Sequence, residues 1–390
     1  MPDEPTPNEQ KHPLELTVVV PTYSAGGFER FFACCYPLVE VVEELSRNAV
    51  NVTVVSRYST NGEIHRNGIR YLFVADSLGE QPRSWQVSLS LLKAVQQLSG
   101  DIVHLHSLSY FNLAAAIKQL QNSSARVVGE YHSDQQKSGV MGYLQRKALS
   151  CLDLLLFSNT ADADKWTDWL APNCPRTGLS IEASSRFCYA PRHSARVTTG
   201  FAGEPVFLWN SRLISRRHPL CVLAGFRQAL EKLSGARLYM MIPDWEPSLL
   251  HKLMSEVHRD PALERAVTLM PGRRPHSEME TFYNSADYLL SASEGDAYGF
   301  GAADAMSCGV IPIVPDLATF RDITDQGSIG GLWELGNTAS LADAIITVVA
   351  RTYGSIDSEA RRAAQSFATR LSYPVIAKEL LGQYHSCLKE

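Results

Sequence analysis

The chain has 390 residues, of which 45% are hydrophobic and 20% charged, and its formal net charge is −5 from 36 basic and 41 acidic residues. These values are ordinary for a globular protein and exclude a disordered chain, a collagen-like chain and a small disulfide scaffold. The small negative charge gives no electrostatic sign of a nucleic-acid or anionic-membrane partner. At about 100–200 residues per domain, the length predicts two domains.

The eight cysteines include no C-x-x-C pair, and most lie in apolar runs. We interpret them as buried thiols of a protein in a reducing compartment. The first 13 residues are polar and proline-rich, unlike a signal or transit peptide. No apolar run approaches the roughly 20 residues that span a bilayer. We therefore expect a cytoplasmic protein, with a peripheral place at the membrane as the alternative.

Short β-branched segments alternate with helical patterns through the first part of the chain. The predicted strands are 16–20, 51–57, 69–74, 101–106, 125–132 and 153–158, and the clearest helices are 28–46 and 84–98. This βαβα order predicts a parallel sheet with helices on both faces.

The pattern breaks at 171–203, which is polar and contains three prolines and three glycines, and which we interpret as a linker. Alternation restarts with a strand at 205–211 and a helix from 218 to about 234. Further strands are predicted at 236–243, 266–272, 288–293 and 311–316. We therefore expect an α/β protein with two doubly wound domains, at 1–190 and 204–365, and a last helical segment at 366–390.

Ligands of doubly wound sheets bind beyond the carboxyl ends of the strands, so the loops that follow the strands are the candidate site. The first such loop contains Gly26 and Gly27. Glycines before a helix start let backbone N–H groups approach a phosphate or sugar, although a plain turn is an equal alternative. The loop lacks the G-x-G-x-x-G pattern, which argues against a nicotinamide dehydrogenase.

His132 ends the fifth predicted strand, where it can donate a hydrogen bond to a bound hydroxyl or phosphate or simply cap the next loop. His104 and His106 alternate in the preceding strand, and we interpret both as structural. No His, Cys or carboxylate group shows metal-ligand spacing, so no metal is predicted.

The segment SRLISRRHP follows the first strand of the second domain and contains Arg212, Arg216 and Arg217. Guanidinium groups beside a helix N-terminus suit a diphosphate, because their planar forks match phosphate oxygens and the helix dipole adds to their charge. A solvated basic turn is the alternative.

The strongest candidate is SEGDAYGFGAADAMSCG, which follows the strand at 288–293. It combines carboxylates with glycines and small residues at a helix start, a combination that a structural turn does not need. Small side chains allow a ligand close to the helix, and Asp304 would point back toward the helix start, within reach of a ribose or sugar hydroxyl. The candidate residues here are Glu294, Asp296, Gly299, Phe300, Gly301 and Asp304.

In this order, the segments resemble those of GT-B glycosyltransferases, in particular the large retaining group called family 4. The resemblance covers most of the chain and rests on PTYSAGGFER, DIVHLHS, GEYHS, SRLISRRH, MPGRRPHSEMETFYNSADYLLSAS and SEGDAYGFGAADAMSCGVIPIV. It implies two Rossmann-like domains facing a cleft, the first on the acceptor side and the second binding the nucleotide sugar. It also implies that the last helix crosses back onto the first domain.

The sequence departs from the family pattern at several site positions. Asp296 and Asp304 stand where the family usually has two glutamates, and Glu294 is an alternative for the first of them. Arg217 stands at the family's lysine, and His218 at its glycine.

The resemblance implies a retaining, metal-independent transfer of a sugar from a nucleotide-diphosphate sugar, with UDP- and GDP-sugars as the expected donors and no other cofactor. Arg212 and Arg217, with amides near Gly26 and Gly27, would neutralise the departing diphosphate. Asp296 or Glu294 would orient the sugar and His132 would contact its hydroxyls. Asp304 would hold the ribose, and a donor phosphate oxygen would take the acceptor proton on the same face of the sugar.

Two other functions remain open at this point. A nucleotide-sugar epimerase shares the architecture but has no second substrate. A non-catalytic protein that binds a sugar nucleotide or a partner transferase would explain the two aspartates. The first would convert the donor to an epimer without an acceptor, and the second would turn over no donor.

The acceptor is a hydroxyl compound whose class the sequence leaves open among sugars, metabolites, proteins and lipid-linked glycans. A helix starting at Gly139 resembles an amphipathic surface for a lipid acceptor, but its only basic residues are Arg146 and Lys147. A core-facing helix is therefore favoured. No nucleic acid and no transmembrane segment are expected, and nothing indicates an oligomeric state.

Overall fold

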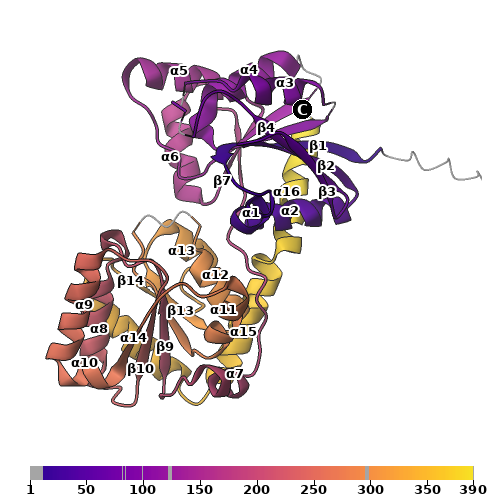
Figure 1. The fold of residues 1–390 in the computed structure, drawn as a ribbon. Coiled ribbons are helices and arrows are strands. Elements are labelled where there is room, and N and C mark those ends of the chain that lie inside the picture. The colour runs from indigo at the N-terminus through magenta and orange to yellow at the C-terminus, as the bar shows by residue number, and fades with distance from the viewer. Residues whose placement is uncertain are drawn as a thin grey trace, which may run out of the picture. The chain divides into compact units, whose positions relative to one another are not determined.

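The computed structural model describes residues 12–80, 82–83, 85–98, 100–121, 125–294 and 298–389. The chain divides into two compact units: unit 1 consists of Met1–Ser180 and Ile376–Glu390, and unit 2 of Ile181–Val375. Each unit contains a largely parallel sheet with helices on both faces (Figure 1), which is the α/β architecture predicted from the sequence. Each unit is described by itself below.

The sheet of unit 1 has eight strands in the order β3-β4-β2-β1-β5-β6-β7-β8, and all neighbours are parallel except β3 and β4. The strands are β1 (Leu14–Ser24), β2 (Val50–Tyr58), β3 (Gly62–Arg66), β4 (Ile69–Ala75), β5 (Ile102–His106), β6 (Arg126–Glu130), β7 (Leu154–Phe157) and β8 (Arg176–Leu179). The strands β3 and β8 were not predicted, because neither contains a buried apolar run.

Alternate side chains of the central strands enter different cores, as a strand buried on both faces requires. Val18 and Val54 belong to one hydrophobic cluster, and their neighbours Val19 and Val55 to the other. The first cluster is covered by α1 (Glu29–Cys34), α2 (Tyr36–Arg47) and α16 (Tyr373–Leu388). The second is covered by α3 (Leu89–Gln96), α4 (Phe111–Gln121), α5 (Gly139–Leu149) and α6 (Thr160–Leu170), with a 3-10 turn, η1 (Leu108–Tyr110), before α4.

The helix predicted at 28–46 is in fact two helices, α1 and α2, which meet at Cys35. Pro37 lies in the first turn of α2. A proline lacks the N–H group that a continuous helix would use and clashes with the preceding turn, so the helix restarts there.

The last helix, α16, packs into the core of unit 1 although it lies about 200 residues away in sequence from the rest of that unit. Ala377, Leu380 and Tyr384 belong to the same hydrophobic cluster as β1. The boundaries between the units lie at 180/181 and 375/376, whereas the sequence suggested breaks near 190, 203 and 365.

The sheet of unit 2 has six parallel strands in the order β11-β10-β9-β12-β13-β14. They are β9 (Val206–Asn210), β10 (Arg237–Ile242), β11 (Val267–Pro271), β12 (Tyr288–Leu290), β13 (Ile311–Pro315) and β14 (Gly331–Trp333). One face is covered by α8 (Pro219–Ala229), α9 (Pro247–Arg259), α10 (Pro261–Ala266) and α14 (Thr338–Thr352). The other is covered by α11 (His276–Asn284), α12 (Phe300–Ser307), α13 (Ala318–Ile323) and α15 (Ile356–Arg370).

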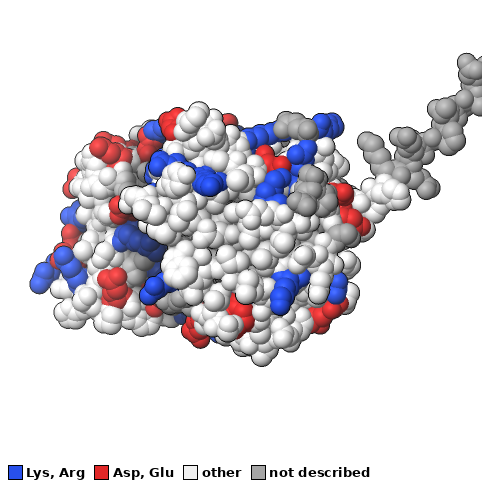
Figure 2. Space-filling view, turned by 90° about the horizontal axis from the view of Figure 1, so that it is seen from above, with Lys and Arg blue, Asp and Glu red and all other residues white. Residues whose placement is uncertain are grey.

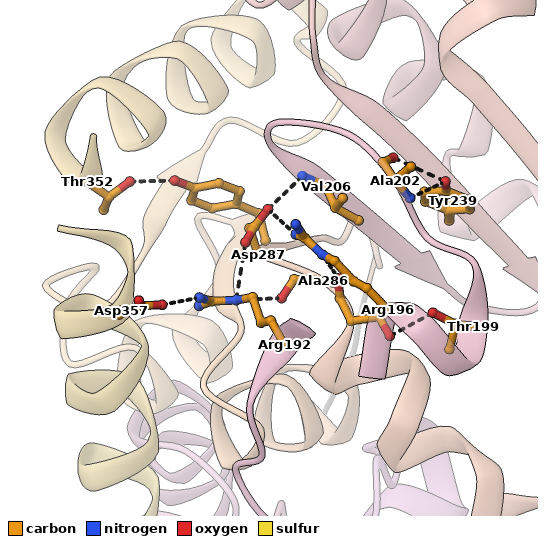
Figure 3. Close-up of polar contacts among 12 residues, drawn as sticks. Arg192, Arg196, Thr199, Ala202, Val206, Tyr239, Ala286, Asp287, Thr352 and Asp357 are labelled. Atoms are coloured by element: carbon orange, nitrogen blue, oxygen red, sulfur yellow. Dashed lines mark hydrogen bonds and ion pairs between the residues drawn. The ribbon is translucent and has the colours of Figure 1, made fainter. Parts of the chain in front are cut away.

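The segment interpreted as a linker, 171–203, is largely built into the two units, because it contains β8 and the helix α7 (Arg192–Thr199). Figure 3 shows that Arg192 and Arg196, one helical turn apart, both contact Asp287 at the amino end of β12. The distances are 3.2 Å from Arg192 Nε and 2.7 Å from Arg196 Nη2. The same carboxylate accepts a 2.7 Å hydrogen bond from the backbone N–H of Val206. Charge pairing of this kind does not appear in a hydrophobic pattern, which is why the helix was missed.

No helix among the described residues is long and apolar enough to cross a membrane. On the face seen in Figure 2, basic and acidic side chains are interspersed around a broad uncharged area. That face has no extended field of one sign, in agreement with the small net charge.

Candidate active site

Unit 2 contains a pocket of about 320 Å³ at the carboxyl ends of its strands β9 and β12. This is the edge of a doubly wound sheet at which ligands bind. Five of the predicted site residues line it: Arg212, Arg217, Phe300, Gly301 and Asp304. Two separate loops of the sequence therefore meet in one cavity.

Arg212 and Arg217 supply the positive charge of this pocket. Arg217 ends a 3-10 turn, η2 (Ser215–Arg217), and its guanidinium donates to Ser293 Oγ, which follows β12. Arg212 lies 3.2 Å from Asp244, but both side chains are more than half exposed, so the ion pair is weak. Arg212 can therefore leave Asp244 to bind another anion. Two guanidinium groups in one cavity can bind the oxygens of a diphosphate.

His218 has a backbone φ of +43°, in the left-handed region that favours glycine. This geometry gives a physical reason for glycine at the equivalent position of the family. Histidine is among the residues that tolerate this region, and its ring lies 3.3 Å from Glu294.

The helix α12 begins at the pocket and depends on glycine there. Gly299 has φ +70°, and a Cβ on it would lie 2.4 Å from Ile323 Cδ1, so no larger residue fits without strain. At Gly301, by contrast, the nearest atom to an added Cβ is Tyr283 Oη at 4.0 Å. A glycine that the protein itself does not require leaves room for a ligand to approach the helix backbone.

Asp304 lines the pocket from the second turn of α12. Burial raises the pKa of this carboxyl to about 7, although a hydrogen bond with Ser185 lowers it in part. Near neutral pH the side chain therefore changes between a hydrogen-bond donor and an acceptor of two hydroxyl hydrogen bonds.

Two other predicted residues of this loop, Glu294 and Gly299, do not line the pocket. Glu294 is exposed, and its carboxylate faces His218 rather than the cavity. Gly299 is needed for the backbone turn that begins α12. Asp296, the predicted sugar-orienting carboxylate, lies outside the described residues.

Gly26 and Gly27 lie in unit 1, in the loop that follows β1. Gly26 has φ +105°, which favours glycine for the turn itself. A Cβ on Gly27 would meet nothing within 4 Å, so the space beside it is open. The carbonyl of Gly27 accepts a 2.9 Å hydrogen bond from Tyr58 Oη.

His132 also lies in unit 1, just beyond β6, and its side chain is 24% exposed. Its Nε2 lies 3.4 Å from Oε2 of the buried Glu130. The same oxygen lies 3.2 Å from His104 Nε2 and 3.3 Å from His106 Nδ1. A carboxylate surrounded by three imidazoles was not predicted from the sequence.

Sequence reasoning also missed several residues that complete the pocket of unit 2. Asn210 follows the buried part of β9, and its amide donates to Tyr283 Oη at 3.1 Å. Trp209 and Phe320 add apolar wall. The only signal for Asn210 was its place at the end of a predicted strand, which by itself does not separate a site residue from a turn residue.

Comparisons with known proteins show similarity to glycosyltransferases. Residues 204–351, which contain β9 to β14 and the pocket, match the family described as glycosyl transferases group 1. A GDP-mannose:cellobiosyl-diphosphopolyprenol alpha-mannosyltransferase of Xanthomonas oryzae is 21% identical over 313 residues, 77% of each chain.

Solved structures extend the likeness to both units. A glycosyltransferase from Rickettsia africae has a TM-score of 0.72 at 14% identity and covers 97% of this chain and 99% of its own. Anabaena HepE in complex with UDP-glucose has a TM-score of 0.66 at 15% identity and covers 96% of this chain and 100% of its own. At these identities the structures establish the fold.

The two parallel sheets, the arginine-lined pocket at the carboxyl edge of the second sheet and the family match over that sheet lead to one conclusion. The chain is a glycosyltransferase of the GT-B fold that uses a nucleotide sugar, and its residues 204–351 match the model of the group 1 glycosyl transferases.

Proposed function

We propose that this enzyme is a retaining, family 4 type glycosyltransferase that moves a sugar from a UDP- or GDP-sugar to a hydroxyl acceptor, with arginines in place of a metal ion at the diphosphate. The observation that supports this most directly is the pocket of unit 2, in which Arg212, Arg217 and Asp304 meet beside the start of α12. Cytoplasmic activity with a peripheral place at the membrane is part of the same proposal.

In the proposed reaction, the bond between the anomeric carbon and the diphosphate breaks through an oxocarbenium-like state. Arg212 and Arg217 neutralise the charge that develops on the leaving diphosphate. The acceptor oxygen bonds to the anomeric carbon from the face that the diphosphate leaves. Its proton passes to a phosphate oxygen of the leaving group, so the enzyme needs no general base.

The other predicted residues take binding roles. Asp304 accepts hydrogen bonds from the ribose, and Gly301 allows the nucleotide close to the backbone of α12. His132 and the amides near Gly26 and Gly27 are predicted contacts of the sugar and the diphosphate, and Asp296 or Glu294 orients the sugar.

Among possible donors we propose GDP-mannose as the first to test. Two relatives from Xanthomonas bear names that specify GDP-mannose as donor and a diphosphopolyprenol-linked acceptor. We propose a lipid-linked saccharide as the acceptor for the same reason.

A feature of α5 supports a lipid-linked acceptor. Its buried side includes Ala148 and Leu149, as the sequence favoured, but Val140 and Tyr143 on its other side are 76% and 60% exposed. The exposed residues Arg146 and Lys147 follow them on the helix. Exposed apolar groups next to basic ones suit the surface of an anionic bilayer.

The direct test is the double variant Arg212→Ala/Arg217→Ala, measured with GDP-mannose and UDP-glucose. We expect kcat/KM for the accepted donor to fall by about 1,000-fold or more, since loss of one donor to a developing anion costs about 100–1,000-fold. Arg216→Ala is the matched control, because Arg216 is an exposed arginine of the same turn that does not line the pocket. We expect it to stay within threefold of the wild type. A folded double variant with unchanged kcat/KM would contradict the assignment.

The same assay separates the alternatives. Donor incubated without acceptor yields slow hydrolysis from a transferase and a new epimer from an epimerase. A non-catalytic binding protein produces neither, although it is stabilised by the donor.

A further inference from the structure

The three imidazoles around Glu130 lie in unit 1 and form a cluster of which the proposed transfer uses only His132. Glu130 and His106 are direct partners in the register of the parallel strands β5 and β6, and His132 follows two residues after Glu130. Neighbouring strands thus bring together ligand types that are 24 and 26 residues apart in sequence. This is why the sequence shows no metal-ligand spacing, although the folded chain has the donors.

The distances within the cluster fit one bound ion. Glu130 Oε2 lies 3.3 Å from His106 Nδ1 and 3.4 Å from His132 Nε2. Ligand atoms that bind one tetrahedral zinc ion at about 2.0–2.1 Å lie about 3.3–3.4 Å apart. All three ligand atoms lie within 4.8 Å of one another.

The charge of the cluster also favours a cation. Glu130 is buried, and its ion pairs within the described part of the chain are with His104, His106 and His132. A buried carboxylate is costly unless a cation compensates it, and neutral imidazole with ionised carboxylate is the form that binds a metal.

His104 supports the cluster from behind. Its Nδ1 lies 2.6 Å from Tyr384 Oη on α16, and its Nε2 faces Glu130 Oε2 at 3.2 Å. The carboxylate favours the tautomer with the proton on Nε2, so the Tyr384 hydroxyl donates to Nδ1. His104, held by Tyr384, can therefore fix the orientation of the Glu130 carboxylate, as residues behind the ligands of a metal ion commonly do.

We propose that His106, Glu130 and His132 bind one divalent transition-metal ion of the zinc or cobalt type. Two imidazole nitrogens and one carboxylate oxygen suit these ions better than magnesium, which prefers oxygen ligands and substrate phosphates. Three protein ligands leave one position open to water, and His106 and His132 are the partly exposed members of the set. The inference goes beyond the proposed transfer, with which it shares only His132, because the arginines of unit 2, and no ion, serve the diphosphate.

The test is a titration of chelator-treated full-length protein with Co²⁺, without nucleotide sugar, followed by visible absorption and by metal analysis. We expect one equivalent bound, with the spectrum of nitrogen and oxygen ligands rather than of thiolates, which distinguishes the site from the eight cysteines. Zn²⁺ should displace the Co²⁺ and raise the Tm.

Variants assign the ligands. His106→Ala and His132→Ala should each weaken Co²⁺ binding by about 100-fold or more, since even outer-shell changes cost about 10–100-fold. His65→Ala is the matched control, because His65 lies on β3 with a 72% exposed side chain, and it should bind as the wild type does. His132→Gln keeps a polar side chain of similar length for the case in which an alanine variant does not fold.

Absence of a Co²⁺ spectrum in the wild type, or equal binding by folded His106 and His132 variants, would overturn the proposal. Donor-induced stabilisation of unit 2 is measured separately, so the failure of one proposal leaves the other testable.

Discussion

At the scale of single residues, Asp304 shows how a one-carbon change acts through its surroundings. The resemblance implies that the residue at this position holds the ribose, and glutamate is usual there. This chain has the shorter Asp304, and burial raises the pKa of its carboxyl to about 7. The unfolded chain has an ordinary aspartate pKa of about 3.9. The folded state therefore binds the extra proton between pH 4 and 7, and its stability falls as the pH rises through that window.

Asp304→Asn should remove this dependence. We expect the variant to be more stable than the wild type at pH 8, by at most about 4 kcal/mol for a shift of about three pKa units, and the advantage to shrink steadily toward pH 4. Urea unfolding of both proteins at pH 5, 6.5 and 8 measures it, and effects of other groups cancel in the difference. If the free energies of unfolding of the two proteins change equally with pH, ionisation of Asp304 does not destabilise the folded state and the prediction is wrong.

At the scale of secondary-structure elements, α7 shows how charge can hold a helix that hydrophobic periodicity does not predict. Ala195 is its only buried residue, and α7 is anchored instead through Arg192 and Arg196 to Asp287. Arg192 also reaches Asp357 in the first turn of α15, at 2.6 Å. The carboxylate of Asp287 thus connects α7, β9 and β12 (Figure 3).

Asp287→Ala should destabilise unit 2 by about 3–5 kcal/mol, because it removes the carboxylate that two mostly buried guanidinium groups share. Thermal or urea unfolding measures the loss. The control is Asp316→Ala, which removes an aspartate from an exposed pair with Arg321 and should cost about 1 kcal/mol or less. Equal effects of the two substitutions would show that burial does not govern the Asp287 cluster.

At the scale of the whole molecule, the exposed side of α5 bears on where the enzyme works. Transfer to a lipid-linked acceptor requires the protein to meet a bilayer, and no helix in the described part of the chain can span one. Insertion of exposed apolar side chains at the interface would then supply the attachment, with help from Arg146 and Lys147.

Val140→Asp/Tyr143→Asp should reduce binding to phosphatidylglycerol-containing vesicles at least tenfold, since burial of each apolar side chain contributes about 1.5–3 kcal/mol. Co-sedimentation measures it, and hydrolysis of soluble donor should stay within twofold. Val197→Asp/Tyr353→Asp is the matched control, with the same residue types at 74% and 89% exposure in unit 2. If both doubles bind vesicles like the wild type, the peripheral location is wrong.

Particular elements show how much of the fold and of the candidate site could be predicted from the sequence. The central strands of both sheets were predictable, because short β-branched apolar runs such as the one in β1 are typical of buried strands. The site loops of unit 2 were predictable for a related reason: they follow those strands, and glycine and arginine at such places have specific chemistry. Short polar elements such as β3 and α7 were not, because they are held by pairing and charge.

By itself, therefore, the sequence determined the α/β class, the two sheets, the arginine and glycine loops and the small net charge of −5. These follow from local patterns of about 5–20 residues. Only the tertiary structure decided that α16 completes unit 1, that 171–203 is built into the units and that three histidines surround Glu130. Each of those depends on contacts between residues far apart in sequence, whose partners no local pattern specifies.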